Sequence, residues 1–225
     1  MILMTSELQS AADRSRAYRA LARAFSLPDR PIYEELVSGE LAEALQLDVP
    51  DEELARELKP ALSFEELQAE YLRLFEVGTP RPPCPLYEGA WREREFLDRR
   101  ELMEELVRFY NFFGLTLGER PKELPDHLAI ELEFLHFLAY QEAQALEEGR
   151  DPDGFRRAQR DFLERHLLRW LPRLRDRLEQ VEALPFFPAV VRGVVRRAER
   201  DYAELLQTLA ARQEQERDPE KEVDP

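Results

Sequence analysis

The sequence predicts an all-α protein, a single bundle of about nine helices in which a proline-rich loop crosses between two helical blocks. Glycine is scarce, with 8 residues in 225, while the strong helix formers Leu, Ala, Glu and Arg are abundant. Apolar residues recur at helical spacing, and no alternating apolar and polar stretch bounded by turn residues predicts a strand. These observations together favour a chain built from helices alone.

The first block contains five predicted helices. They cover about residues 5–25, 32–37, 40–45, 51–58 and 63–75. Capping-box patterns, Ser6 with Gln9 and Ser63 with Glu66, mark two of the starts, because such pairs satisfy the free backbone N–H groups of a first turn. The Ser-Leu-Pro-Asp-Arg-Pro segment after the first helix breaks it.

A proline-dense stretch, residues 77–89 (VGTPRPPCPLYEG), separates the two blocks, with four prolines within six residues. Proline fixes φ and lacks an N–H group, so this segment should be extended and stiff. It is either a linker or a hinge that crosses the face of one bundle. Cys84 is expected to be a small residue in an exposed loop. His127 could approach it in space, but nothing in the sequence demands the base that a nucleophilic thiol needs.

Five more helices are predicted in the second block, at about residues 91–113, 126–148, 152–168, 170–184 and 189–209. Gly114 and Gly149 should end the first two, and Asp126 is a good N-cap for the second. We expect residues 1–210 to form a single helical domain. Residues 211–225 are polar and lack apolar periodicity, which predicts a flexible acidic tail.

The charge balance limits the possible partners. Asp and Glu total 47 and Lys and Arg 32, so the formal net charge is −15. Such a chain is a poor ligand for nucleic acid or an anionic membrane and suits a positively charged partner. A single cysteine excludes an internal disulfide framework, and no apolar run approaches the roughly 20 residues that span a bilayer. Since the first residues do not resemble a secretion signal, we expect a cytoplasmic protein.

One pair of residues raises the possibility of metal chemistry. Glu133 and His136 form an E-x-x-H pair on one helix face, which is half of a di-iron bundle pattern. A complete site needs a second such pair and two more carboxylates, and the region ending at His166 has the wrong spacing. A helical-bundle metalloprotein therefore remains the alternative hypothesis. No P-loop, G-x-G-x-x-G or G-x-S-x-G motif supports a nucleotide fold or a hydrolase.

The stretch 125–134 (PDHLAIELEF) is the most unusual in the chain. His127 should face the positive end of a helix, which disfavours its protonated form. His127 and Glu131 lie one turn apart, and in a compact bundle they would lie beside the proline-rich loop. Acidic groups beside apolar residues would form a site for a basic, partly apolar peptide.

Several segments in order resemble the TorD/DmsD/NarJ family of redox-enzyme maturation chaperones. The P-D-H-L-x-x-E-L-E-F stretch is the most specific, and the resemblance covers about residues 10–209. The other matching segments are YLRLF at 71–75, PPCPLYE at 82–88, FYNFFGL at 109–115, ELPDHL at 123–128, DFL at 161–163, HL at 166–167 and WLP at 170–172.

The resemblance implies an all-helical, cytoplasmic protein that is not an enzyme and needs no cofactor or metal. Members bind the twin-arginine leader, or another segment, of a molybdopterin oxidoreductase and hold that apoenzyme until its cofactor is inserted. Carried over by position, the peptide-binding residues are Tyr87, Glu88, Asp126, His127 and Glu131. Long helices joined by a proline hinge are compatible with a monomer or a domain-swapped dimer.

Overall fold

The computed structural model describes residues 2–45, 52–59, 61–92, 99–116 and 123–217. Within these ranges every regular element is helical, and the one β-type feature is an isolated bridge between Tyr87 and His127. The elements are α1 (Ile2–Ala24), α2 (Arg30–Ser38), α3 (Glu40–Leu45), α4 (Glu52–Glu57), α5 (Phe64–Tyr71), the π-helical turn η1 (Leu72–Glu76), α6 (Gly89–Arg92), α7 (Arg99–Phe112), α8 (Leu128–Glu147), α9 (Asp153–Phe162), the π-helical turn η2 (Leu163–Leu167), α10 (Leu168–Leu178) and α11 (Phe186–Arg217). The all-α prediction is confirmed.

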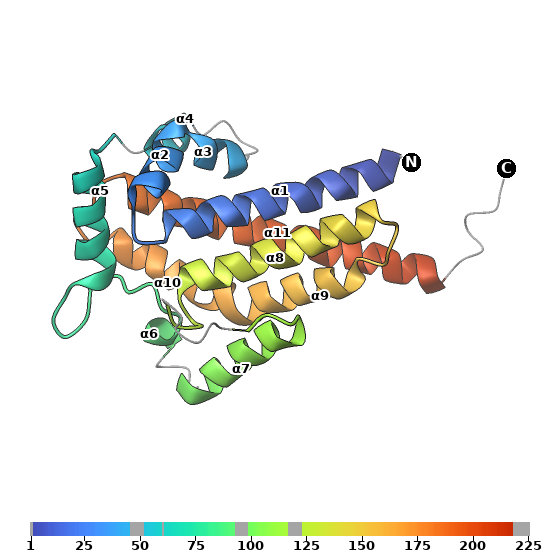
Figure 1. The fold of residues 1–225 in the computed structure, drawn as a ribbon. Helices are drawn as coiled ribbons and strands as arrows, with labels where there is room; N and C mark the ends of the chain where they lie inside the picture. The colour runs from blue at the N-terminus through green and yellow to red at the C-terminus, as the bar shows by residue number, and fades with distance from the viewer. Residues whose placement is uncertain (1, 46–51, 60, 93–98, 117–122, 218–225) are drawn as a thin grey trace.

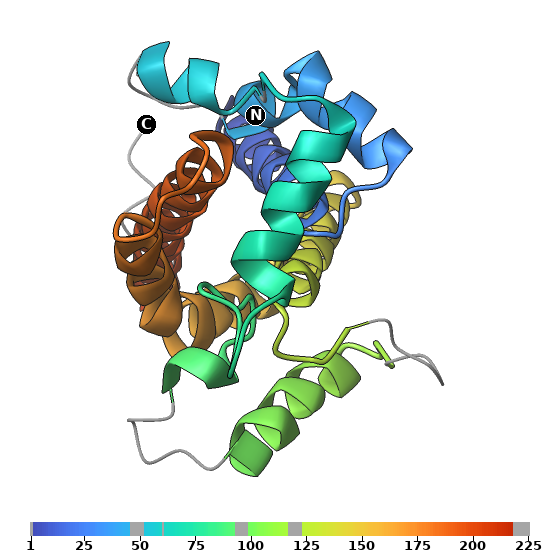
Figure 2. The ribbon, with the colours of Figure 1, turned by 90° about the vertical axis from the view of Figure 1, so that its left-hand side faces the viewer.

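The long helices α1, α8 and α11 run side by side, and α9, η2 and α10 form one continuous helix that packs against α8 and α11 (Figure 1). The short helices α2, α3 and α4 lie on one side of this bundle, and α7 lies on the opposite side. Seen along the long helices, α5 crosses the end of the bundle between α4 and α6 (Figure 2). One cluster of buried apolar side chains draws on elements from α1 to α11, so the two helical blocks share a core.

Local signals account for several helix ends. Ser63 caps α5, and the reciprocal bonds between Ser63 and Glu66 form the predicted capping box. The capping box expected at Ser6 and Gln9 is wrong, because α1 already begins at Ile2 and Ser6 lies inside it. Gly114, with φ +74°, follows the end of α7 as predicted, in a left-handed conformation that suits glycine.

Two other helices end at positions that differ from the predicted ones, and residues near these ends make contacts that are distant in sequence. The helix predicted at residues 170–184 ends at Leu178, and the carboxylate of Glu70 accepts a hydrogen bond from the Leu184 N–H (2.8 Å). The last helix continues past the predicted end at residue 209 as far as Arg217, and Arg212 pairs with Asp153 of α9 (2.5 Å). Parts of the predictions lie outside the described residues. These parts are residues 51 and 93–98 of two predicted helices, residues 117–122 of a predicted loop and residues 218–225 of the predicted tail.

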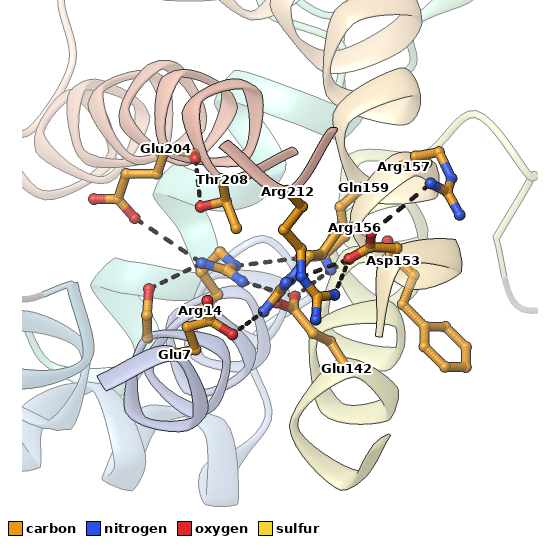
Figure 3. Close-up of polar contacts among 12 residues, drawn as sticks. Glu7, Arg14, Glu142, Asp153, Arg156, Arg157, Gln159, Glu204, Thr208 and Arg212 are labelled. Carbon is orange, nitrogen blue, oxygen red and sulfur yellow. Dashed lines mark hydrogen bonds and ion pairs between the residues drawn. The ribbon is translucent and has the colours of Figure 1, made fainter. Parts of the chain in front are cut away.

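A buried polar network joins α1, α8 and α9 on the inside of the bundle (Figure 3). We call it the Glu142 network. The Glu142 carboxylate accepts hydrogen bonds from Arg14 Nη2 (2.7 Å), Arg156 Nε (2.8 Å) and Gln159 Nε2 (2.8 Å). All four side chains are buried, and Arg156 also pairs with Glu7 (2.9 Å). Burial alone would raise the pKa of Glu142, but the two guanidinium groups lower it overall.

None of the described helices is both long enough and apolar enough to cross a membrane.

Candidate functional site

The proline-rich loop is fixed on the bundle by backbone hydrogen bonds. Cys84 N–H donates to the Leu74 carbonyl (2.9 Å), which ties the loop to η1. Glu88 N–H donates to the Asp126 carbonyl (2.9 Å), and Leu128 N–H donates to the Leu86 carbonyl (2.8 Å), which joins the loop to the start of α8. The loop is therefore a crossing on the face of one bundle. This contact brings all five predicted site residues into one region.

The predicted N-cap of α8 is wrong by one residue. His127 occupies the cap, with extended backbone angles, and its Nδ1 accepts a hydrogen bond from Ala129 N–H (3.2 Å). Asp126 turns its side chain toward α6 instead, where Oδ2 accepts a hydrogen bond from Gly89 N–H (3.2 Å). Since the imidazole nitrogen satisfies the first turn of α8, the Asp126 carboxylate is left to fix the start of α6.

Three of the predicted residues form a buried acidic cluster, which we define as Glu88, Asp126 and Glu131. Each of these side chains is fully enclosed, with 0% of its surface exposed. Glu88 accepts hydrogen bonds from His166 Nδ1 (2.9 Å) and Arg92 Nη1 (2.5 Å).

The third acid of the cluster is bound by a buried side chain of α10. Glu131 Oε2 accepts a hydrogen bond from Trp170 Nε1 (3.2 Å). The spacing in residues 125–134 did not identify Arg92, His166 or Trp170 as neighbours of this cluster. His166 and Trp170 appear in the segments that carry the family resemblance, which gave no role to either.

Burial controls the protonation of these groups. Enclosure raises the pKa of Glu131 well above its ordinary value, and the charge of Glu88 raises it further. Enclosure also raises the pKa of Asp126, although Gly89 and Arg99 oppose this shift. Burial lowers the pKa of His127 to about 4, which is the expected direction but has a cause other than the helix end. The cluster consequently holds less negative charge than three exposed carboxylates would.

The cluster keeps unused hydrogen-bonding capacity. Among the described residues, Asp126 Oδ1, His127 Nε2 and Glu131 Oε1 are buried and have no hydrogen-bond partner. Buried polar atoms are usually paired, so these atoms are candidates to receive a ligand group or water.

Tyr87 is the most accessible of the five predicted residues. Its ring is half-buried and packs edge-on against the ring of His127, with centroids 4.9 Å apart. Its hydroxyl donates a hydrogen bond to the Glu123 carboxylate (2.9 Å). Tyr87 thus covers His127 at the outer edge of the acidic cluster.

The residues that suggested thiol or metal chemistry either are enclosed or lie outside the acidic cluster. Cys84 is fully buried, not exposed as expected, and burial raises its pKa to about 11, so its thiol stays protonated. His136 Nδ1 lies 2.8 Å from Ser15 Oγ of α1, and the described residues contain no group of three or more His, Cys, Asp or Glu side chains placed to hold a metal ion.

Comparisons with known proteins identify the family. Residues 39–176 match the family described as nitrate reductase delta subunit. The chain is 43% identical over 166 residues to the selenate reductase assembly chaperone protein of Thauera selenatis, covering 74% of this chain and 77% of the relative. It is 45% identical over 163 residues to the chlorate reductase assembly chaperone protein of Ideonella dechloratans, covering 70% and 82%.

A solved structure has the same fold. It is described as a putative redox enzyme maturation protein from Archaeoglobus fulgidus, and the TM-score is 0.53 at 24% identity, with 82% of this chain and 93% of the other covered. The relatives are named as assembly chaperones and not as catalysts, so this chain is a chaperone and not an enzyme. The chain therefore belongs to the TorD/DmsD/NarJ family of redox-enzyme maturation chaperones, as the sequence motifs indicated.

Proposed function

We propose that this protein binds the twin-arginine leader, or another N-terminal segment, of a molybdopterin oxidoreductase catalytic subunit in the cytoplasm. It would hold that subunit in its apo form until the cofactor is inserted, before export. The observation that carries this proposal is the high identity to chaperones named for the assembly of selenate and chlorate reductases. The net charge of −15 supports a client segment that carries paired arginines.

We assign the binding region to Tyr87, Glu88, Asp126, His127 and Glu131. Tyr87 is accessible at the edge, whereas the carboxylates beneath it are enclosed. A client guanidinium would reach Asp126 Oδ1 or Glu131 Oε1 only after the loop carrying Tyr87 moves away from the start of α8. This opening breaks the two backbone hydrogen bonds that join the loop to that point, together with the bonds from Gly89 N–H to Asp126 and from the Tyr87 hydroxyl to Glu123, so client binding must compensate for their loss.

The apolar part of the client segment should supply most of the affinity. Burial of a large apolar side chain contributes about 1.5–3 kcal/mol before ordering costs, whereas an exposed ion pair contributes about 0–1 kcal/mol. The carboxylates should set orientation and selectivity through charge-assisted hydrogen bonds to arginine.

The test is calorimetric titration of the full chain with a synthetic leader peptide at two salt concentrations. Asp126→Asn keeps an oxygen for the Gly89 N–H, and Glu131→Gln keeps one for Trp170, so both variants remove an ionisable carboxyl group and conserve shape. Each should weaken binding by about threefold to tenfold, while polar substitutions in the apolar part of the peptide should nearly abolish it. Glu104→Gln is the matched control, because Glu104 is exposed and its partner Arg100 lies on the same helix.

Two results would count against the proposal in different ways. If apolar substitutions in the peptide are harmless and salt abolishes binding, the energetic ranking is wrong. If no leader peptide binds, the client is recognised through another segment. Size-exclusion chromatography with light scattering, with and without the peptide, distinguishes a monomer from a domain-swapped dimer.

A further inference from the structure

Two accessible carboxylates interact where the proline-rich loop leaves η1. Glu76 is the last residue of η1 and is exposed, and Glu123 precedes the start of α8 and is half-buried. Burial raises the pKa of Tyr71, directly before η1, and the charges of Glu76 and Glu123 raise it further, so these groups lie in one region. The Tyr87 hydroxyl donates a hydrogen bond to Glu123 (2.9 Å), which places this region at the outer edge of the acidic cluster.

The two carboxylates repel each other. Partial burial raises the pKa of Glu76, and the charge of Glu123 raises it further. Within the part of the chain that the structure describes, neither group forms an ion pair, and Glu123 has one hydrogen-bond donor, the Tyr87 hydroxyl. Guanidinium groups bound here would relieve the repulsion and form charge-assisted hydrogen bonds.

Exposed apolar side chains accompany both carboxylates. Val77 follows Glu76 and is 64% exposed, and Leu124 follows Glu123 and is 45% exposed. Leu72, at the start of η1, is 36% exposed. We define the outer face as Leu72, Glu76, Val77, Glu123 and Leu124. Its combination of negative charge and apolar surface suits a segment that carries arginine next to apolar residues.

His127 supplies a hydrogen-bond donor beside the outer face. Its Nδ1 accepts a hydrogen bond from Ala129 N–H, so the neutral ring carries its proton on Nε2. Nε2 is buried and has no partner among the described residues, and the charge of Glu123 acts on this ring. A buried N–H group without an acceptor favours a bound carbonyl oxygen, which the backbone of a peptide offers.

We propose that the outer face binds the part of the client segment that carries the paired arginines, with their guanidinium groups on Glu76 and Glu123. Adjoining apolar side chains of the client would lie on Val77 and Leu124. This role rests on the proposed function and adds a surface to it, since none of these residues belongs to the five assigned above. The outer face is accessible while the loop still covers the acidic cluster. The client segment therefore meets the outer face first and reaches the enclosed carboxylates only after the loop has moved.

The test is calorimetric titration of the full chain with two synthetic peptides, a twin-arginine leader and the same leader with glutamine in place of both arginines. The double variant Glu76→Gln with Glu123→Gln removes both charges and keeps an oxygen for the Tyr87 hydroxyl. It should bind the arginine peptide about threefold to tenfold more weakly than the wild type does, and the glutamine peptide equally well. Added salt should reduce the first effect, because exposed charges are screened. Val77→Ser should weaken binding of both peptides, since the apolar contact does not involve arginine.

Glu147→Gln with Glu148→Gln is the matched control. It removes the same number of charges at the opposite end of α8, where both side chains are exposed. It should change binding by less than about twofold, and both double variants should melt at the temperature of the wild type.

Three results overturn this role of the outer face. They are an effect of the double variant at Glu76 and Glu123 no larger than that of the control, equal weakening of both peptides by this variant, or unchanged affinities of Val77→Ser. The leader still binds the wild type in each of these cases, so the proposed function stands. If the wild type binds neither peptide, recognition of the leader fails together with this role.

Discussion

Replacement of Glu142 by Ala should be one of the most damaging single changes in this protein. The Glu142 carboxylate accepts three hydrogen bonds, two of them from the guanidinium groups of Arg14 and Arg156. The exposed fraction of the side chain is 1% for Glu142, 5% for Arg14 and 1% for Arg156, so water does not replace the lost carboxylate. Arg156 would keep Glu7 and a longer pair with Asp153 (3.4 Å), while Arg14 would keep Ser10, Gln159 and a long pair with the half-exposed Glu204 (3.9 Å).

Breaking a buried ion pair from one side costs about 3–5 kcal/mol, because the opposite charge stays buried without compensation. Since part of the compensation survives at both arginines, we expect Glu142→Ala to lose about 4 kcal/mol of unfolding free energy, within that range. Glu142→Gln keeps an acceptor oxygen and should lose about 2 kcal/mol. Such losses are a large share of the 5–15 kcal/mol that a typical protein of this kind has.

The assay is urea unfolding followed by far-ultraviolet circular dichroism at pH 7. Glu104→Ala is the control, since its pair with Arg100 is exposed and should contribute less than about 1 kcal/mol. The two guanidinium groups keep the pKa of Glu142 below its usual range, so its contribution is present above about pH 4.5 and is lost as the pH falls. The difference between wild type and Glu142→Ala should therefore shrink in acid.

The reasoning is refuted if Glu142→Ala costs no more than Glu104→Ala. A triple replacement, Arg14→Met with Glu142→Leu and Arg156→Leu, removes all three charges together. It should recover most of the lost stability, because uncompensated charge and not the absence of the network causes the damage.

Three further predictions concern the region of the acidic cluster. Because burial holds the pKa of His127 near 4, below the 6.5 of an exposed histidine, the unfolding free energy should fall by up to about 3 kcal/mol as the pH drops through that window. His127→Asn keeps a cap acceptor and should flatten this dependence in urea titrations, whereas parallel curves would contradict it. The pKa of Glu131 is raised, so ionisation of this carboxyl group destabilises the folded state as the pH rises above about 4.5. Glu131→Gln should therefore melt at pH 8 at a temperature at least as high as that of the wild type. A lower melting temperature would show the prediction to be wrong. Tyr110 donates a buried hydrogen bond to the Pro125 carbonyl (2.8 Å). Tyr110→Phe should lower the unfolding free energy, measured by urea denaturation, by about 1 kcal/mol. An unchanged free energy would show that this bond does not stabilise the fold.

The parts of the fold that depend on neighbouring residues could be predicted from the sequence. The capping box at Ser63 and the glycine stop at Gly114 are local signals, and both are present. The hydrogen bond from the Leu184 N–H to Glu70 could not be predicted, because the two residues are 114 positions apart in the sequence. The contact between α11 and α9 through Arg212 and Asp153 could not be predicted either, because it also joins residues far apart in the sequence.

The candidate site divides in a similar way. The unusual stretch at residues 125–134 indicated that His127 lies beside the proline-rich loop, and the ring of His127 contacts that of Tyr87 in this loop. The enclosure of Asp126 was not evident, because an Asp before a helix is normally a cap and only the position of Gly89 directs it elsewhere. His166 reaches Glu88 across 78 residues of sequence, and spacing along one helix cannot reveal such a pair.

The π-helical turn η2 has a consequence for the helices that follow it. It holds one more residue than an ordinary helical turn, within a helix that is otherwise continuous from Asp153 to Leu178. Deletion of one residue from this turn would rotate everything after it by about 100° relative to α9. Trp170 would then leave Glu131, although His166 could stay beside Glu88. The number of residues in this turn thus fixes the rotation of α10 relative to η2. This rotation allows His166 of η2 and Trp170 of α10 to bind carboxylates of the same acidic cluster.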